Sequence, residues 1–347
     1  MLLKMDRGTQ VIRQDTCVGF IVRSAECYTR CEPPLEAGQT GPGSTQGLAI
    51  MAMNRSVEQV NQVLDIINAT HGTEFTLLSR FSTGEWGAYR IAQPDGQSAV
   101  LKFVTDLHDT NIVDPNPHLP GMITDRLRTL GYPTPRYLLA GRLHEDGLYW
   151  VQEELPGMPL WVDPTVEQVE RLICFLKLQR NQSVSREQNL SQFVKAVLFK
   201  AHRGMTDRLK NHSGETRTIL DVAMGLAEGA ADLPLPDTDI VHGDFSYHQV
   251  MVEDGRITGI IDWQEAGCGD WLIDLTRLIY SLHDRPMLTA PIMEELSGHD
   301  TRRIKLYTAF TAVEMVAWPV HQHGRDVATG SMNKARSALR FARTEFG

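Results

Sequence analysis

Two aspartates of this chain, 18 residues apart, each follow a short apolar run. Asp244 ends the stretch Val241–Asp244, and Asp262 follows the apolar pair Ile260–Ile261. Transfer of a phosphoryl group needs one carboxylate that orients the attacking hydroxyl and accepts its proton. It needs another that holds the magnesium ion on the nucleotide phosphates. The segment around these two aspartates can supply both carboxylates.

Each of these residues also has an ordinary structural explanation. Gly243 permits a sharp turn that would present Asp244 at a loop tip, where a carboxylate can act as a general base or only hydrogen-bond its own turn. Asp262 is costly to bury without a partner, and either a magnesium ion or a strand-end turn would satisfy it. His242 lies between a buried run and the turn, and we interpret it as structural rather than catalytic.

A lysine in the first third of the chain is a candidate phosphate ligand. Strand alternation over residues 98–104 places Lys102 on the same face as Val100 and Val104, which predicts an inward-facing ammonium group. Such a group needs an anion, and nucleotide phosphates or a carboxylate would serve. The alternative is a lysine on an edge strand that favours solubility.

The turn over residues 82–87, between the first two predicted strands, contains glycines that can bring backbone N–H groups close to phosphate oxygens. Its candidate residues are Thr83, Gly84 and Gly87. Many hairpins carry two glycines, so the pattern alone is weak. Its position ahead of Lys102 is what indicates a phosphate-covering loop.

The composition is that of a globular protein. The chain has 347 residues, of which 42% are hydrophobic and 22% charged, and no apolar run approaches the roughly 20 residues that cross a bilayer. The N-terminus lacks the apolar core of a secretory signal, so we expect a cytoplasmic protein with no membrane partner. The five cysteines form no Cys-x-x-Cys pair, which favours reduced thiols.

Negative charge is concentrated in one part of the sequence. Residues 233–299 contain twelve acidic and three basic side chains, a difference of −9 that equals the net charge of the whole chain. This distribution favours a metal ion and a positively charged small substrate, although a solvated acidic surface explains part of it. It argues against nucleic acid, which would need a basic surface.

The first half of the chain divides into an extension and a β-rich region. Residues 1–52 include a segment of flexible-linker composition and are expected to form a flexible N-terminal extension, with Met51 or Met53 as a hypothetical natural start. In residues 53–156, Ser56 and Gln59 have capping-box spacing at the start of a helix. Strands are predicted over 75–81, 86–92, 98–104, 137–142 and 148–155, the first three forming an antiparallel meander.

Residues 157–347 are mostly helical in pattern. Pro156–Pro159 is expected to be a hinge between the two regions. Helices are predicted over 165–179, 190–210, 216–231, 271–282 and 302–318, the last one ending at Pro319 because proline cannot donate the helical hydrogen bond. The fold class is therefore α+β, with a small β-rich lobe, a hinge, a larger α-rich lobe and a cleft between the lobes.

Together these residues resemble the aminoglycoside phosphotransferase and choline kinase family, a branch of the protein-kinase-like fold. In that family a loop of His-Gly-Asp and a later Asn precedes a strand pair and Ile-Asp-Trp or Ile-Asp-Phe. The matching residues here are His242–Asp244, Gln249 and Ile261–Trp263, followed by Gly269–Asp270 and Asp274–Leu275. The resemblance covers most of the chain and implies two lobes with the active site between them.

The resemblance also implies a role for each matched residue. Asp244 would be the catalytic base, Asp262 would hold Mg²⁺ on the phosphates of ATP or GTP, and Lys102 would contact the α- and β-phosphates. The turn with Thr83, Gly84 and Gly87 would cover the phosphates. The backbone of the hinge at Glu153 and Leu155 would receive the base.

Two departures from the family pattern matter. Gln249 stands where the family has the Asn that binds a second metal, and its extra methylene displaces the amide oxygen by roughly 1.5 Å, although magnesium requires strict octahedral geometry. A further helix is predicted around residues 123–130, after the Lys102 strand. It has no Glu to pair with that lysine, and Asp125 is the nearest acid.

The resulting hypothesis is an ATP- or GTP-dependent small-molecule kinase that phosphorylates a hydroxyl group of an aminoglycoside-like antibiotic or an amino-alcohol. The competing hypothesis is a nucleotide-binding, pseudokinase-like protein without efficient transfer, which the two departures favour. A kinase for protein side chains is a third option. It is disfavoured because the segment between Asp262 and Asp274 is too short to organise a peptide.

Overall fold

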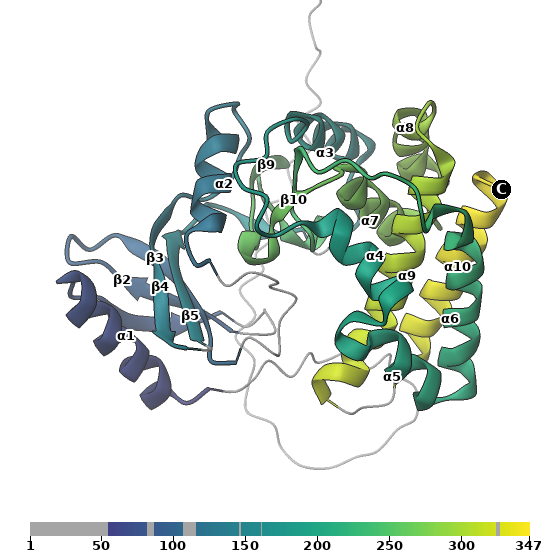
Figure 1. Cartoon of the computed structure of the whole chain (residues 1–347). Helices are drawn as coiled ribbons and strands as arrows, with labels where there is room; N and C mark the ends of the chain where they lie inside the picture. The colour runs from purple at the N-terminus through teal and green to yellow at the C-terminus, as the bar shows by residue number, and fades with distance from the viewer. Residues whose placement is uncertain (1–54, 82–86, 107–115, 146, 161, 324–326) are drawn as a thin grey trace, which may run out of the picture. The chain divides into compact units, whose positions relative to one another are not determined.

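The computed structural model of the chain (Figure 1) describes residues 55–81, 87–106, 116–145, 147–160, 162–323 and 327–347. The chain divides into two units between Ala49 and Ile50. The predicted N-terminal extension, residues 1–52, lies outside the described residues. The fold given below is that of the second unit.

A five-stranded antiparallel sheet forms the β-rich region, and helix α1 (Val57–His71) covers one of its faces (Figure 1). The predicted capping box of α1 is confirmed, because Ser56 Oγ accepts from Gln59 N–H at 3.2 Å and the Gln59 side chain accepts from Ser56 N–H at 2.8 Å. The order β1-β2-β3-β5-β4 contains the predicted meander. The strands are β1 (Thr76–Arg80), β2 (Ala88–Ala92), β3 (Ser98–Val104), β4 (Tyr137–His144) and β5 (Gly147–Glu153).

The two faces of β3 have different surroundings. Ala99, Leu101 and Phe103 belong to the apolar cluster that contains the buried residues of α1. Lys102 lies on the opposite face, as the strand period of two requires. Since β3 pairs with β2 on one side and β5 on the other, Lys102 is on an interior strand. The edge-strand explanation of this lysine is therefore wrong.

The second region contains most of the helices and two small sheets. Helix α2 (Leu119–Arg128) precedes β4, and β6 (Met158–Pro159) follows β5 and pairs with β8 (Val250–Glu253), which pairs with β9 (Arg256–Ile260). The other small sheet joins β7 (Asp239–Val241) and β10 (Gly267–Gly269). The remaining helices are α3 (Val166–Leu178), α4 (Leu190–Lys200), α5 (Met205–His212), α6 (Gly214–Ala227), α7 (Leu272–Leu282), α8 (Pro286–Leu296), α9 (Thr301–His323) and α10 (Thr329–Glu345).

Two predicted helix boundaries are wrong. The predicted helix 190–210 is interrupted, because Ala201 and Gly204 adopt left-handed conformations, with φ of 49° and 64°, between α4 and α5. Helix α9 continues through Pro319 to His323 instead of ending before the proline. A proline removes only one backbone donor, and α9 packs against α6, α7 and α10, so tertiary contacts can maintain it (Figure 1).

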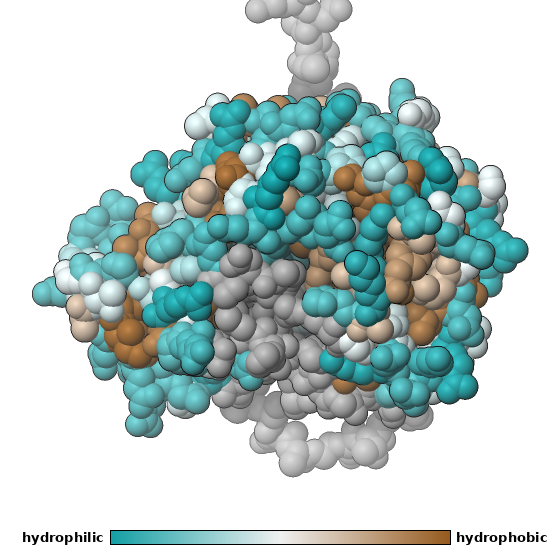
Figure 2. Space-filling view, in the orientation of Figure 1, coloured by the Kyte–Doolittle hydropathy of each residue, from teal (hydrophilic) through white to brown (hydrophobic). Residues whose placement is uncertain are grey.

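No helix among the described residues is long and apolar enough to cross a membrane. The coloured part of the surface in Figure 2 is mostly hydrophilic, with apolar side chains in separate patches. Such scattered apolar side chains are normal on a protein surface and do not indicate a docking site.

Candidate active site

The turn that presents Asp244 follows the short strand β7. Gly243 has a φ of +87°, a backbone conformation that favours glycine. A Cβ atom at this position would lie 2.9 Å from the carbonyl oxygen of Glu265 and 3.1 Å from Leu190 Cδ1. The glycine is therefore required both by the backbone conformation and by the close approach of a neighbouring segment.

A buried carboxylate from α7 holds this turn in place. Asp274 Oδ2 accepts from His242 N–H at 2.7 Å, and Asp274 Oδ1 accepts from Gly243 N–H at 3.1 Å. Gln179 Nε2 donates to the same carboxylate at 2.9 Å. Burial raises the pKa of Asp274 to about 6, although all three hydrogen bonds favour its charged form.

His242 connects the Asp244 turn to the segment that carries Asp262. Its Nε2 atom lies 2.7 Å from the carbonyl oxygen of Ile261, so this nitrogen carries the proton of a neutral ring. Burial lowers the pKa of His242 to about 4. The side chain is fully buried, and its geometry agrees with the predicted structural role.

Asp262 and Lys102 form an ion pair between β3 and the segment that follows β9. Asp262 adopts a left-handed conformation with φ of 73°, which is uncommon for a residue other than glycine. The side chain of Lys102 is 15% exposed and that of Asp262 33% exposed. Burial lowers the pKa of Lys102 to about 8, while the nearby Asp244 carboxylate raises it. Asp125, by contrast, is an exposed residue of α2.

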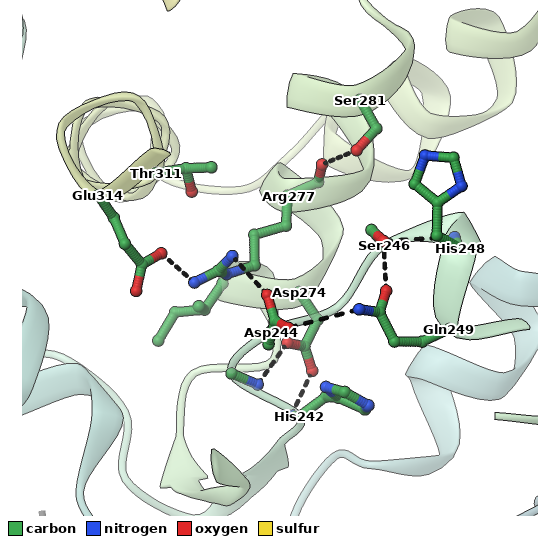
Figure 3. A network of polar contacts seen from close by, with 12 residues as sticks. His242, Asp244, Ser246, His248, Gln249, Asp274, Arg277, Ser281, Thr311 and Glu314 are labelled. Atoms are coloured by element: carbon green, nitrogen blue, oxygen red, sulfur yellow. Dashed lines mark hydrogen bonds and ion pairs between the residues drawn. The ribbon is translucent and has the colours of Figure 1, made fainter. Parts of the chain in front are cut away.

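Gln249 lies beside the carboxylate of Asp244 (Figure 3). Its Nε2 atom donates to Asp244 Oδ2 at 3.4 Å, and its Oε1 atom accepts from the hydroxyl of Ser246. Ser246 also caps the turn that contains Gln249, because its side chain accepts from His248 N–H at 3.3 Å. The amide oxygen that would bind a metal therefore lies in the site, with a hydroxyl group as its present partner.

Arg277 reaches Asp244 from α7 (Figure 3). Its Nη1 atom lies 3.5 Å from Asp244 Oδ1, and its Nη2 atom contacts Glu314 of α9. The side chains of Arg277 and Glu314 are 4% and 5% exposed, whereas that of Asp244 is 45% exposed. Burial raises the pKa of Asp244, while the charges of Arg277 and Lys102 lower it.

The predicted nucleotide-base residues lie at the end of β5. Glu153 N–H donates to the carbonyl oxygen of Arg136 at 2.8 Å, and its carboxylate accepts from Arg136 N–H at 3.1 Å. Leu155 packs against Gly259 of β9. Gly87, with φ of +79°, precedes β2. Thr83 and Gly84 lie outside the described residues.

The donor atoms at the site fit a magnesium ion chemically. The carboxylate of Asp262 and the amide oxygen of Gln249 are hard oxygen ligands, and magnesium usually takes one or two carboxylates together with phosphate oxygens and water. Among the residues that the structure describes, no group of three or more His, Cys, Asp and Glu side chains could hold a metal. A magnesium ion bound largely through nucleotide phosphates does not need such a group.

The sequence-based interpretation missed Arg277 and Glu314, although their positions carried a signal. Arg277 follows Asp274 by three residues within the otherwise apolar helix α7. Glu314 is a charged residue in the apolar stretch Ala309–Ala317 of α9. Charged side chains at such positions are almost never fully buried without partners, so their occurrence in two apolar helices predicts a buried pair.

The sheet, the helical region and the carboxylate loop at their junction are those of a phosphotransferase with a protein-kinase-like fold. The model of the phosphotransferase enzyme family matches residues 86–307. The chain therefore belongs to this family.

One curated relative is the hygromycin-B 4-O-kinase of Escherichia coli, which is 31% identical over 100 residues. These residues are 26% of this chain and 28% of the length of that kinase. The sequence match thus spans less than a third of the relative.

Solved structures with the same fold include a thermostable variant of aminoglycoside phosphotransferase APH(4)-Ia with AMP-PNP and hygromycin B. It has a TM-score of 0.61 and 17% identity, and the match covers 81% of this chain and 98% of that one. The choline kinase LicA of Streptococcus pneumoniae has a TM-score of 0.58 and 14% identity, covering 83% and 99% of the two chains. These similarities establish the protein-kinase-like fold that the sequence predicted.

Proposed function

We propose that this protein transfers the γ-phosphoryl group of ATP or GTP to a hydroxyl group of a small molecule. The observation that carries the proposal is the meeting of Lys102, Asp262 and Asp244 at the junction of the sheet and the helical region. These residues come from three separate segments, and they are the groups that phosphoryl transfer requires.

Each residue has a definite task in this reaction. Lys102 would bind nucleotide phosphate oxygens, in exchange for its present contact with Asp262. Asp262 and Gln249 would hold magnesium, which supplies positive charge that neutralises the phosphates. Asp244 would orient the acceptor hydroxyl and accept its proton. The turn with Thr83, Gly84 and Gly87 would cover the phosphates. The backbone at Glu153 and Leu155 would bind the base.

A cationic acceptor fits the charges around Asp244. The guanidinium group of Arg277 interacts electrostatically with four carboxylates, those of Glu314, Asp244, Glu265 and Asp274. Excess negative charge attracts an amine-bearing molecule by long-range electrostatics. The partial match to a hygromycin-B kinase makes an aminoglycoside the first acceptor to test, and an amino-alcohol the second. The predicted cytoplasmic location remains part of the proposal.

The test is a screen of the purified protein for phosphoryl transfer, with ATP and GTP each combined with hygromycin B, spectinomycin, further aminoglycosides, macrolides, peptide antibiotics and choline. The product is identified by mass spectrometry as the acceptor plus one phosphate. We expect transfer to at least one amine-bearing acceptor. The control is the same acceptor with the reacting hydroxyl converted to a methyl ether, which should give no phosphorylated product.

The second candidate function is nucleotide binding without efficient transfer. It is favoured by the contacts of Gln249, whose amide oxygen is engaged by Ser246. Calorimetric titration with AMP-PNP and magnesium separates the two functions. Tight nucleotide binding without a phosphorylated product from any acceptor would favour the second candidate, and absence of binding would exclude both.

A further inference from the structure

We propose that Arg277, held by Glu314, is a positioning residue that fixes the carboxylate of Asp244 for catalysis. The inference rests on the proposed role of Asp244 and adds two residues to it. Arg277 and Glu314 come from α7 and α9, and neither lies in the segment that carries Asp244.

The guanidinium group of Arg277 contacts two carboxylates with different nitrogen atoms. Nη1 lies 3.5 Å from Asp244 Oδ1, and Nη2 contacts Glu314 Oε2. Figure 3 shows the arginine side chain extended between the α9 carboxylate and the Asp244 loop. Because a guanidinium group is planar and its donors have fixed directions, a contact at one end restricts the orientation of the other.

The exposures of the three side chains differ in a way that fits this role. Arg277 and Glu314 are almost completely buried, whereas nearly half of the Asp244 side chain is open to solvent. The buried pair cannot itself reach an acceptor molecule. It can hold Oδ1 of Asp244 while Oδ2, which faces Gln249 Nε2, stays on the side of the predicted metal ligands.

A loop carboxylate needs such support because its own turn provides little. Asp274 accepts hydrogen bonds from the backbone of His242 and Gly243, so it fixes the main chain of the turn. The side chain of Asp244 can still rotate about its own bonds. Arg277 is the cation that contacts this side chain directly in the described part of the structure, and a misplacement of about 1 Å can cost a factor of about 100 in rate.

The alternative is that the buried pair only joins α7 to α9. The same two segments offer a matched control for this alternative. Arg303 of α9 donates to Asp270, two residues before α7, at 2.8 Å, and the Asp270 side chain is almost fully buried. This pair also links α9 to the α7 segment, but it does not contact Asp244.

The experiment compares wild-type protein with the double variant Arg277→Met/Glu314→Met and with Arg303→Met. Replacing both members of a buried pair by apolar side chains is often neutral for stability, so the double variant should fold. With a working acceptor, we expect kcat of the double variant to fall about 100-fold. The KM for ATP should change less than about twofold, since Lys102 and Asp262 do not contact the pair. Arg303→Met should lower the melting temperature with kcat nearly unchanged.

A crystal structure of the double variant gives a second readout that does not depend on turnover. We expect the Asp244 side chain to adopt a different rotamer or several rotamers. An unchanged Asp244 together with an unchanged kcat would overturn the positioning role, and so would an equal loss of kcat in Arg303→Met. If wild type phosphorylates no acceptor, the proposed function fails, while the Asp244 rotamer in the variant still decides the positioning role.

Arg277→Lys tests the importance of the two-armed contact. Lysine keeps the charge but is a point donor without the planar fork. We expect it to recover only part of the lost rate, and full wild-type kcat in Arg277→Lys would show that the charge alone suffices.

Discussion

The carboxylate of Asp244 is subject to opposing influences. Burial raises its pKa, whereas Arg277 and Lys102, which approach from α7 and β3, lower it. A general base must be ionised before the reaction and must accept a proton during it. The two cations therefore favour the ionised form of Asp244, which burial disfavours.

Replacing Asp244 by alanine should separate chemistry from nucleotide binding. We expect kcat to fall by about 100- to 10,000-fold, the usual contribution of a general base. The affinity for AMP-PNP should stay nearly unchanged, because Lys102 and Asp262 remain. Steady-state kinetic assays measure kcat, and calorimetry measures the affinity for AMP-PNP. Lys102→Ala is the control and should lose nucleotide affinity. A variant Asp244→Ala with near-normal kcat would contradict the proposed base.

Shortening Gln249 to asparagine should keep or raise the activity. Asparagine provides the same amide oxygen without the extra methylene, and magnesium is strict about ligand distance. The measurement is kcat as a function of magnesium concentration for wild type and Gln249→Asn. Ser246→Ala, which removes the hydroxyl partner of the amide oxygen, shows how much of any effect comes from that contact. A large loss of activity in Gln249→Asn would mean that Gln249 has a different role.

Among the single residues of the candidate site, those with a local signal stand out in the sequence. Lys102 lies within β3, Asp244 lies three residues after β7 and Asp262 two residues after β9, and that pattern is visible in a few neighbouring residues. The ionic partner of Lys102 could not be predicted. It is Asp262, 160 residues later, and no local pattern connects two positions so far apart in the chain.

At the scale of elements, α7 supports the site at two points. Its first turn places Asp274 under the backbone of the Asp244 turn, and one turn later Arg277 reaches the Asp244 side chain. Residues three apart lie on the same face of a helix, so one apolar helix presents both charges in the same direction. Helix α9 then supplies Glu314 as the second partner of the arginine.

Replacing Gly243 by alanine tests the turn that follows β7. A positive φ costs an alanine about 1–2 kcal/mol, and its Cβ would in addition lie 2.9 Å from the carbonyl oxygen of Glu265. We expect a lower melting temperature and a strong loss of kcat, because the turn must shift and carries Asp244 with it.

Gly255→Ala is the matched control for this prediction. Gly255 has φ of +76° in the turn between β8 and β9, and nothing lies within 4 Å of an added Cβ. The positive φ should lower the free energy of unfolding of this variant by a similar amount, and its kcat should stay unchanged. Equal kcat values in the two alanine variants would show that the close contact at Gly243 is unimportant for catalysis.

At the scale of the whole molecule, contacts across the junction connect the sheet to the helical region. Lys102 of β3 pairs with Asp262, and the Tyr137 hydroxyl of β4 accepts from Gln264 Nε2 at 3.1 Å. Both partners lie in the short segment after β9. If nucleotide phosphates replaced Asp262 as the partner of Lys102, one of these contacts between the sheet and the helical region would be lost.

Buried ionisable groups of the helical region predict a pH dependence of stability. The pKa of His242 is about 4, below its ordinary value of 6.5, so the unfolded chain binds a proton that the folded chain does not between these pH values. The stabilisation is present above pH 6.5 and is lost as the pH falls toward 4. Asp274 and Glu314, with pKa values of about 6 and 7, have the opposite sign, because the folded state binds their protons more readily.

The variant His242→Gln isolates the histidine contribution. Glutamine can still donate to the Ile261 carbonyl but does not titrate. We compare the free energy of unfolding of wild type with that of the variant. The wild-type value minus the variant value should decrease by about 1.4 kcal/mol as the pH falls from about 7.5 to about 5.5. Urea unfolding at both pH values measures this difference. A constant difference would show that His242 is not held neutral in the folded protein.

The elements and the class of chemistry could be read from the sequence, because both depend on short-range patterns. The capping box at Ser56, the alternation around Lys102 and the glycine before Asp244 each express a local backbone preference. The break between α4 and α5, the continuation of α9 through Pro319 and the Arg277–Glu314 pair depended on the tertiary structure. Packing and burial against distant segments decide these features, and the energies of such contacts exceed the local preferences that a sequence displays.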